Sequence, residues 1–228
     1  MKIVPAHVWN PDPVRAGVQA TVISGGTALD GDETVIQTDG GGRVEISYGE
    51  FDLDDPYARR LWDAWQDYFS GGARVVAVPV LALELAPVPA GTSATIGVDD
   101  QWFPTSVSFS PPMIIAETVG LAPLRAVTIT LDISQGDAPE PGTWFGIGYR
   151  AYKIRRVISV SGSQYEVEFS PPLRDAVADA TPVNMDWPVV QCRPVLGQDL
   201  IPQISNGQYG SMSVSFVEDF TPLSEVVE

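Results

Sequence analysis

The fold is decided by residues 54–72, which read Asp-Asp-Pro-Tyr-Ala-Arg-Arg-Leu-Trp-Asp-Ala-Trp-Gln-Asp-Tyr-Phe-Ser-Gly-Gly. Asp55 suits the N-cap of a helix because its carboxylate can accept a backbone N–H, and Pro56 suits the first helical position. Gly71 or Gly72 can end the helix in the left-handed conformation. Because the start and stop signals agree, the sequence predicts one long helix over 55–70.

One side of this helix is apolar. Its apolar residues recur at spacings of three and four, which places Ala58, Leu61, Trp62, Trp65 and Phe69 in one stripe. Arginine, aspartate and glutamine take the other side. We expect Leu61, Trp62, Trp65 and Phe69 to form the core stripe of the helix and to cover a sheet.

The composition indicates a folded protein with many turns. Of its 228 residues, 44% are hydrophobic and 18% are charged, which is enough to bury a core in one domain or two. The 21 glycines and 20 prolines favour short strands. A net charge of −16 argues against binding nucleic-acid phosphates or anionic lipid. No stretch is typical of a signal peptide or a membrane span, so we expect a soluble product made in a cytoplasm.

Strand-like stretches flank the helix. They are residues 14–23, 43–48, 74–80 and 211–218, and a long glycine-rich loop is expected between the first two. The last of them lies near the C terminus and needs a sheet to join. We therefore predict that residues 1–86 and about 190–228 form one domain.

The middle of the chain predicts an inserted domain. Two prolines within 86–91 mark its start, because they favour extended backbone. Residues 127–133 alternate as a half-buried strand does, and 164–169 pair with the strand before them through a turn at 161–163. One helical turn is expected over 172–179.

The predicted fold is therefore mainly β. It comprises a β-sandwich or split-barrel domain with one flanking α-helix, plus an inserted small β-barrel domain over 87–189.

Few motifs that carry chemistry are present. His7 is the only histidine and Cys192 the only cysteine, which disfavours a nucleophile system and excludes a zinc site built on paired cysteines. Residues 146–151 match a dinucleotide-binding string but continue into a strand, where that motif needs a helix. Acidic residues at 30–33 and 52–55 lack the spacing of a calcium loop. We expect no catalytic residue, no metal site and no cofactor.

Tryptophans outside the helix are the remaining candidates for a binding site. An exposed indole can stack on a sugar ring, and Trp102 and Trp144 are the candidate glycan-stacking residues. Burial in a core or in a subunit contact is the alternative for both.

Two sets of landmarks resemble a known family. The first comprises Phe51-Asp52-Leu53, residues 58–65, Phe69-Ser70-Gly71-Gly72 and a Val-rich strand with Pro79. It is similar to the amino-terminal domain of tail-tip proteins of long-tailed bacteriophages and gene transfer agents. The second comprises residues 146–154 and 169–174, and it is similar to the small β-barrel domain of such proteins.

The resemblance implies a distal tail or hub protein of the virion, made in the host cytoplasm and located at the tail tip or baseplate. In that family the β domain and its helix assemble into a ring, a hexamer by analogy. The ring continues the tail tube and connects the tube protein to the hub or fibres. DNA would pass without specific binding, which suits an acidic ring because like charges repel. The polar face of the helix is then expected near a subunit boundary, with no membrane insertion.

Two other functions stay open. A carbohydrate-binding module or adhesin at the tail tip would use Trp102 or Trp144. A cell-wall hydrolase would need two nearby carboxylates, which some pair among 29 acidic residues can supply. We expect a structural protein and not an enzyme.

Overall fold

The computed structural model describes residues 1–20, 22–37, 41–88, 114–205, 207 and 209–222. The prediction of a mainly β protein is confirmed. The chain divides into two compact units: unit 1 is Met1–Leu81 with Val189–Glu228, and unit 2 is Ala82–Pro188. The sequence analysis places its domain boundaries at 86/87 and near 189/190.

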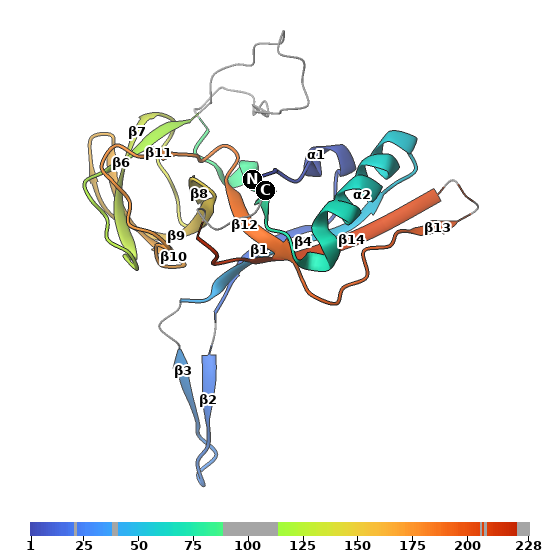
Figure 1. Cartoon of the computed structure of the whole chain (residues 1–228). Coiled ribbons are helices and arrows are strands. Elements are labelled where there is room, and N and C mark those ends of the chain that lie inside the picture. The colour runs from blue at the N-terminus through green and yellow to red at the C-terminus, as the bar shows by residue number, and fades with distance from the viewer. Residues whose placement is uncertain (21, 38–40, 89–113, 206, 208, 223–228) are drawn as a thin grey trace. The chain divides into compact units, whose positions relative to one another are not determined.

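Unit 1 is built on a sheet that curls into a half-barrel (Figure 1). Its strands follow the order β1-β4-β14-β12-β5, and β13 pairs with β14. They are β1 (Val14–Gln19), β4 (Arg43–Asp52), β5 (Val76–Pro79), β12 (Val189–Pro194), β13 (Gln203–Ser205) and β14 (Tyr209–Glu218). The C-terminal strand pairs with β4, so that Phe216 lies opposite Ile46. The two ends of the chain thus build one sheet.

The long helix, α2 (Pro56–Phe69), has the predicted N-cap. The Asp55 carboxylate accepts the Ala58 N–H at 3.1 Å. At the other end the left-handed C-cap is Ser70 and not a glycine, and Gly71 follows in the same conformation within the short 3₁₀ turn η1 (Ser70–Gly72). Gly72 is needed for a different reason, because an added Cβ would lie 3.0 Å from the Pro194 carbonyl of β12. Gly72 therefore serves close packing after the helix has ended, whereas an added Cβ at Gly71 would meet no atom within 4 Å.

Helix α2 lies across β4 and β14 in Figure 1 and buries its apolar side there. Trp62 is fully buried, and its ring centroid is 5.3 Å from that of Phe51 and 5.1 Å from that of Trp9 in α1 (Ala6–Trp9). The ring of Phe69 contacts Phe216 at 5.9 Å. Leu61, Trp62, Trp65 and Phe69 are all buried, so this stripe is the core of unit 1.

A buried phenol links two strands beneath the helix. The Tyr48 hydroxyl on β4 donates to the Pro79 carbonyl of β5 at 2.6 Å. Burial, and then the nearby Cys192 thiol, raise the pKa of Tyr48 well above its usual value. The phenol therefore stays a neutral hydrogen-bond donor.

Unit 2 is a six-stranded sheet that nearly closes into a barrel. In the order β11-β6-β7-β10-β9-β8, its strands are β11 (Pro182–Val183), β6 (Ile115–Val119), β7 (Thr128–Gln135), β10 (Gln164–Ser170), β9 (Arg150–Ser161) and β8 (Trp144–Ile147), and the 3₁₀ turn η2 is Leu83–Leu85. Gly146 and Asn184 exchange two backbone hydrogen bonds, of 2.7 and 2.8 Å, which join the ends of the sheet. Its core includes Leu131, Phe145 and Phe169.

The helical turn predicted over 172–179 is wrong. Leu173 and Val177 donate their backbone N–H groups to Ala126 and Ala122, at 2.9 and 2.8 Å. Those donors are therefore not available for a helix. In contrast, residues 146–151 form a tight hairpin turn with Gly148 at φ 59°, as expected of a stretch that continues into a strand.

Replacing Trp65 by alanine should destabilise unit 1 by about 3–5 kcal/mol, the usual cost of truncating a large buried aromatic residue. Trp65 is 6% exposed and contacts Phe69, with 5.5 Å between ring centroids. Tyr57 on the same helix is 55% exposed, so Tyr57→Ala is the matched control and should change stability by less than about 0.5 kcal/mol. Urea unfolding would measure the free energy of unfolding of both variants. An unfolding curve of Trp65→Ala that matches the curve of the wild type would show that this ring is not part of the core.

Candidate interaction site

The stretch between β1 and β4, expected to be a glycine-rich loop, contains a β-hairpin. Among the residues that the structure describes, strands β2 (Val22–Thr27) and β3 (Glu33–Gln37) pair only with each other and form a two-stranded sheet (Figure 1). Ile23 lies opposite Ile36 and Ser24 opposite Val35, with an irregularity after Ser24. The prediction of a loop, which begins after the strand-like stretch 14–23, is therefore wrong over 24–27 and 33–37.

The hairpin exposes aliphatic side chains on both of its faces. Opposed residues share a face and successive residues alternate, so Ile23 and Ile36 lie on one face and Val35 on the other. The exposed fractions are 55% for Val22, 56% for Ile23, 59% for Val35, 56% for Ile36 and 112% for Leu29. An isolated two-stranded hairpin is marginally stable in water, and contiguous exposed apolar surface marks interaction sites. These properties identify the hairpin as the candidate interaction site.

The tip of the hairpin is acidic. Residues 22–37 contain Asp30, Asp32 and Glu33 and no basic residue. Asp30 accepts the Asp32 N–H at 3.2 Å, and Glu33 accepts the Ser24 hydroxyl at 2.7 Å. These carboxylates shape the turn, which is an ordinary role for turn acids.

The root of the hairpin is fixed by a glycine. Gly42 has a φ of 86°, and a Cβ at this position would collide with the Gln19 carbonyl at the end of β1. The close approach of the two strands where the hairpin leaves the half-barrel therefore requires glycine at position 42.

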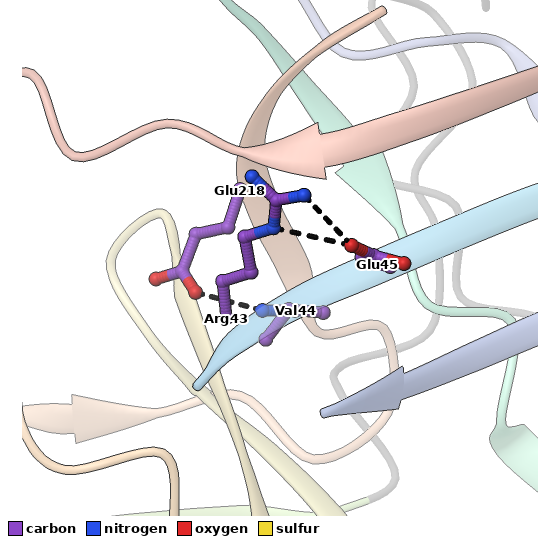
Figure 2. Close-up of polar contacts among 4 residues, drawn as sticks. All are labelled: Arg43, Val44, Glu45 and Glu218. Atoms are coloured by element: carbon purple, nitrogen blue, oxygen red, sulfur yellow. Dashed lines mark hydrogen bonds and ion pairs between the residues drawn. The ribbon is translucent and has the colours of Figure 1, made fainter. Parts of the chain in front are cut away.

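Two carboxylates hold the first residues of β4 beside this root. In Figure 2 the Arg43 guanidinium points to Glu45, with Nη2 and Oε1 3.1 Å apart, on the exposed side of the strand. The Glu218 carboxylate comes from the end of β14 and accepts the Val44 N–H at 2.9 Å. Glu218 is 5% exposed, so its carboxylate satisfies a backbone donor that is shielded from water.

Asp219 anchors the chain after β14. It accepts the Thr221 N–H at 2.9 Å and lies 3.5 Å from the Arg193 guanidinium of β12. Burial acts to raise the pKa of Asp219, but hydrogen bonds from Thr221 and Gln191 and the charge of Arg193 together outweigh it. The net effect is a lowered pKa.

The half-barrel has an open edge next to the hairpin. At one end of the sheet, β5 is covered by residues 2–4, where Val4 donates to Ala77 at 2.8 Å. At the other end, β1 has no strand on its outer side among the residues that the structure describes. The hairpin thus connects β1, which is the strand at the open edge, with β4, which is the neighbour of β1 in the sheet.

Of the two predicted glycan-stacking residues, the structure describes Trp144 and not Trp102. Trp144 is 3% exposed, with the Lys153 ammonium 5.8 Å from its ring centroid, so it has no free face for a sugar. Trp102 lies outside the described residues. The prediction that Trp144 stacks on a glycan is therefore contradicted by its burial.

Other residues weighed for chemistry have structural roles. Asp54 accepts the Gly210 N–H at 3.0 Å, Asp55 caps α2, and Cys192 is buried. Within the described ranges, no group of three or more His, Cys, Asp or Glu residues is placed to hold a metal ion. Of the helices described, none is long and apolar enough to cross a membrane.

Replacing Glu218 by alanine should cost about 1–3 kcal/mol of stability, because the Val44 N–H stays buried without an acceptor. Glu218→Gln should recover part of the loss, since an amide oxygen can accept the same bond. Glu45→Ala is the matched control, because it removes an exposed ion pair worth about 0–1 kcal/mol. Urea unfolding of the three variants measures their free energies of unfolding. Equal losses of stability in Glu218→Ala and Glu45→Ala would contradict the prediction.

Asp219 should make stability fall at acid pH. A carboxyl group with a lowered folded-state pKa stabilises the fold above the pKa of the unfolded state, about 3.9, and the contribution disappears as pH falls through the folded-state value. Asp219→Asn should therefore reduce the fall in melting temperature that the wild type shows between about pH 4 and about pH 2. Asp63→Asn, at an exposed position of α2, should keep the wild-type pH dependence, and the same slope for all three proteins would rule out the linkage.

No protein-family model matches the chain, and no curated protein sequence matches it either. The functional interpretation therefore rests on the hairpin, its root, and the sequence landmarks described above.

Proposed function

We propose that this protein is a non-enzymatic structural component of the tail tip of a long-tailed bacteriophage or gene transfer agent. It assembles with copies of itself into a ring that continues the tail tube and connects it to the hub or fibres. The observation that carries the proposal is the β2–β3 hairpin, whose aliphatic side chains are exposed on both faces. The resemblance of residues 51–79 and 146–174 to tail-tip proteins supports the same function.

The hairpin favours assembly because the exposure of its aliphatic side chains to water is unfavourable in free energy. Ile23, Ile36, Val22 and Val35 are each more than half exposed, and burying a Val or Ile side chain contributes about 1.5–3 kcal/mol. Since the two faces point in opposite directions, full burial needs partner surface on both sides. A neighbouring subunit that receives the hairpin would supply that surface.

The geometry of such a contact favours a ring. A hairpin that docks on a different surface of the next copy makes a heterologous contact, and repetition of that contact closes into a ring when the rotation permits. The open edge of β1 offers a second place where sheets of adjacent subunits can meet. The polar face of α2 would then lie near the subunit boundary.

The charge of the chain suits a passage for DNA. A net charge of −16 on each subunit would give the ring a strongly negative field. DNA is repelled by such a surface and does not adhere to it. A channel with these properties lets a polyanion pass without binding it.

Native mass spectrometry and light scattering near physiological ionic strength should show a closed oligomer, a hexamer by analogy with the family. Ile23→Ser combined with Ile36→Ser removes apolar surface from one hairpin face and should shift the protein toward monomer. Because neither side chain is buried, far-UV circular dichroism should not change. Electron microscopy of the wild-type oligomer should show rings.

The matched control is Leu196→Ser combined with Ile201→Ser, which removes two aliphatic side chains of unit 1 that are 65% and 67% exposed. This variant should assemble as the wild type does. A wild-type protein that is monomeric at every concentration and absent from purified tails would refute the proposal. Loss of assembly in both double variants would show that the hairpin has no special role.

A further inference from the structure

Two cations of unit 1 share one aromatic ring in the last turn of α2. The Lys2 ammonium lies 4.4 Å from the ring centroid of Tyr68, and the Arg74 guanidinium carbon lies 4.9 Å from the same centroid. Among the described residues, no other aromatic ring has two cations beside it. Lys2 is exposed, and Tyr68 and Arg74 are partly exposed. These three residues, here named the cation site, are therefore accessible to a partner.

The cation site has no counter-ion of its own. In the described part of the chain, no carboxylate forms an ion pair with Lys2 or Arg74. The Tyr68 ring attracts each cation, but two cations beside one ring also repel each other. The dipole of α2 favours positive charge near its C-terminal end, but it provides no anion to pair with that charge. Both charges are thus available to an anionic partner.

The tip of the β2–β3 hairpin has the complementary chemistry. All charged residues of 22–37 are acidic, and Leu29 in the turn is 112% exposed. The carboxylates of Asp30 and Glu33 hold the turn, whereas the Asp32 carboxylate makes no hydrogen bond or ion pair with any described residue. An exposed leucine beside a free carboxylate matches an accessible aromatic ring beside unpaired cations.

We propose that the hairpin tip of one copy binds the cation site of a neighbouring copy. The Asp32 carboxylate pairs with Lys2 and Arg74, and Leu29 packs on the Tyr68 ring. Because the tip and the site are different surfaces of unit 1, the contact is heterologous and repeats from copy to copy. This inference rests on the proposed function, since it names the surface that receives the hairpin in the ring.

Charge reversal on each side of the contact tests the inference. Sedimentation velocity of the full chain, near physiological ionic strength, measures the concentration at which half of the copies are assembled. Asp32→Lys and Arg74→Glu should each raise this concentration at least about tenfold, because each places like charges opposite each other. The matched controls are Asp175→Lys and Arg125→Glu, which make the same charge changes at exposed positions of unit 2 and should leave it unchanged.

Two further variants test the apolar half of the contact and guard against misfolding. Leu29→Ser should weaken assembly without a change in far-UV circular dichroism, because the Leu29 side chain is fully exposed. If Arg74→Glu lowers the melting temperature, Lys2→Gln combined with Arg74→Gln replaces it. That variant removes both cations without adding a negative charge, and it should also weaken assembly.

A mixing experiment shows whether the contact joins two copies. Asp32→Lys supplies a cationic tip and an unchanged site, and Arg74→Glu supplies an unchanged tip and an anionic site. In a ring that alternates the two variants, every tip therefore faces a site of opposite charge. A one-to-one mixture should assemble at a concentration at which neither variant assembles alone. The chain that carries both changes should also assemble.

Four results would overturn the inference. If the wild type assembles and the two charge reversals do not weaken assembly, the hairpin tip binds elsewhere and the ring proposal stands. Equal weakening by the controls in unit 2 would identify a general effect of charge. Rescue in the chain with both changes, but not in the mixture, would identify a contact within one copy. A wild type that is monomeric at every concentration and absent from purified tails would refute the proposed function, and this contact with it.

Discussion

The packing of Trp62 is the contact on which unit 1 depends. Its indole contacts Trp9 near the N terminus and Phe51 on β4, and its N–H donates to the Leu200 carbonyl at 3.1 Å. These residues come from the first part of the chain, from the strand before α2, and from the segment that returns after unit 2. Trp9 also donates to the Ala58 carbonyl of α2 at 3.3 Å, so the aromatic cluster satisfies its own polar atoms inside the core. One side chain thus joins parts of the unit that are separated by a whole insertion.

The two sheets solve the problem of exposed strand edges differently. An unpaired edge offers backbone N–H and C=O groups to any other chain, and closure of a sheet removes it. Unit 2 joins its ends through Gly146 and Asn184, and is therefore complete by itself. In unit 1, residues 2–4 cover β5, whereas no described strand pairs with the outer side of β1, and the strands β1 and β4 lead into the apolar hairpin. Features that favour association are therefore concentrated at one end of the half-barrel sheet.

Secondary structure could be predicted from the sequence where a segment buries one face. It could not be predicted where a segment buries neither face, and contacts that depend on the pairing register of two strands could not be predicted either. Helix α2 was predictable because its stripe repeats at helical spacing between clear end signals. The membership of β14 in the sheet of unit 1 followed from alternation and from the need of a terminal strand for a sheet, whereas its pairing with β4 was not predicted. The β2–β3 hairpin was missed beyond Ile23, where the predicted strand 14–23 ends, because both of its faces are exposed, so Val35-Ile36 shows no alternation, and the surrounding glycines indicate a loop. The pairing of Glu117 on β6 with Asp132 on β7 could not be predicted, since it depends on a register that sequence alone does not fix.

The start of β4, from which the chain leads back to the hairpin, is held by residues at the far end of the chain. Glu218 accepts the Val44 N–H, and Asp219 immediately after it is held by Thr221 and Arg193, so the end of β14 is fixed beside the hairpin root. Gly42 brings that root close to Gln19. A docking element gains affinity when its base is rigid before binding, because less conformational entropy is lost on association. Residues 218 and 219 thus order the start of β4, although they lie more than 170 positions later in the sequence than Val44. In the assembly proposed above, a rigid start of β4 would lower the conformational entropy lost when the hairpin docks.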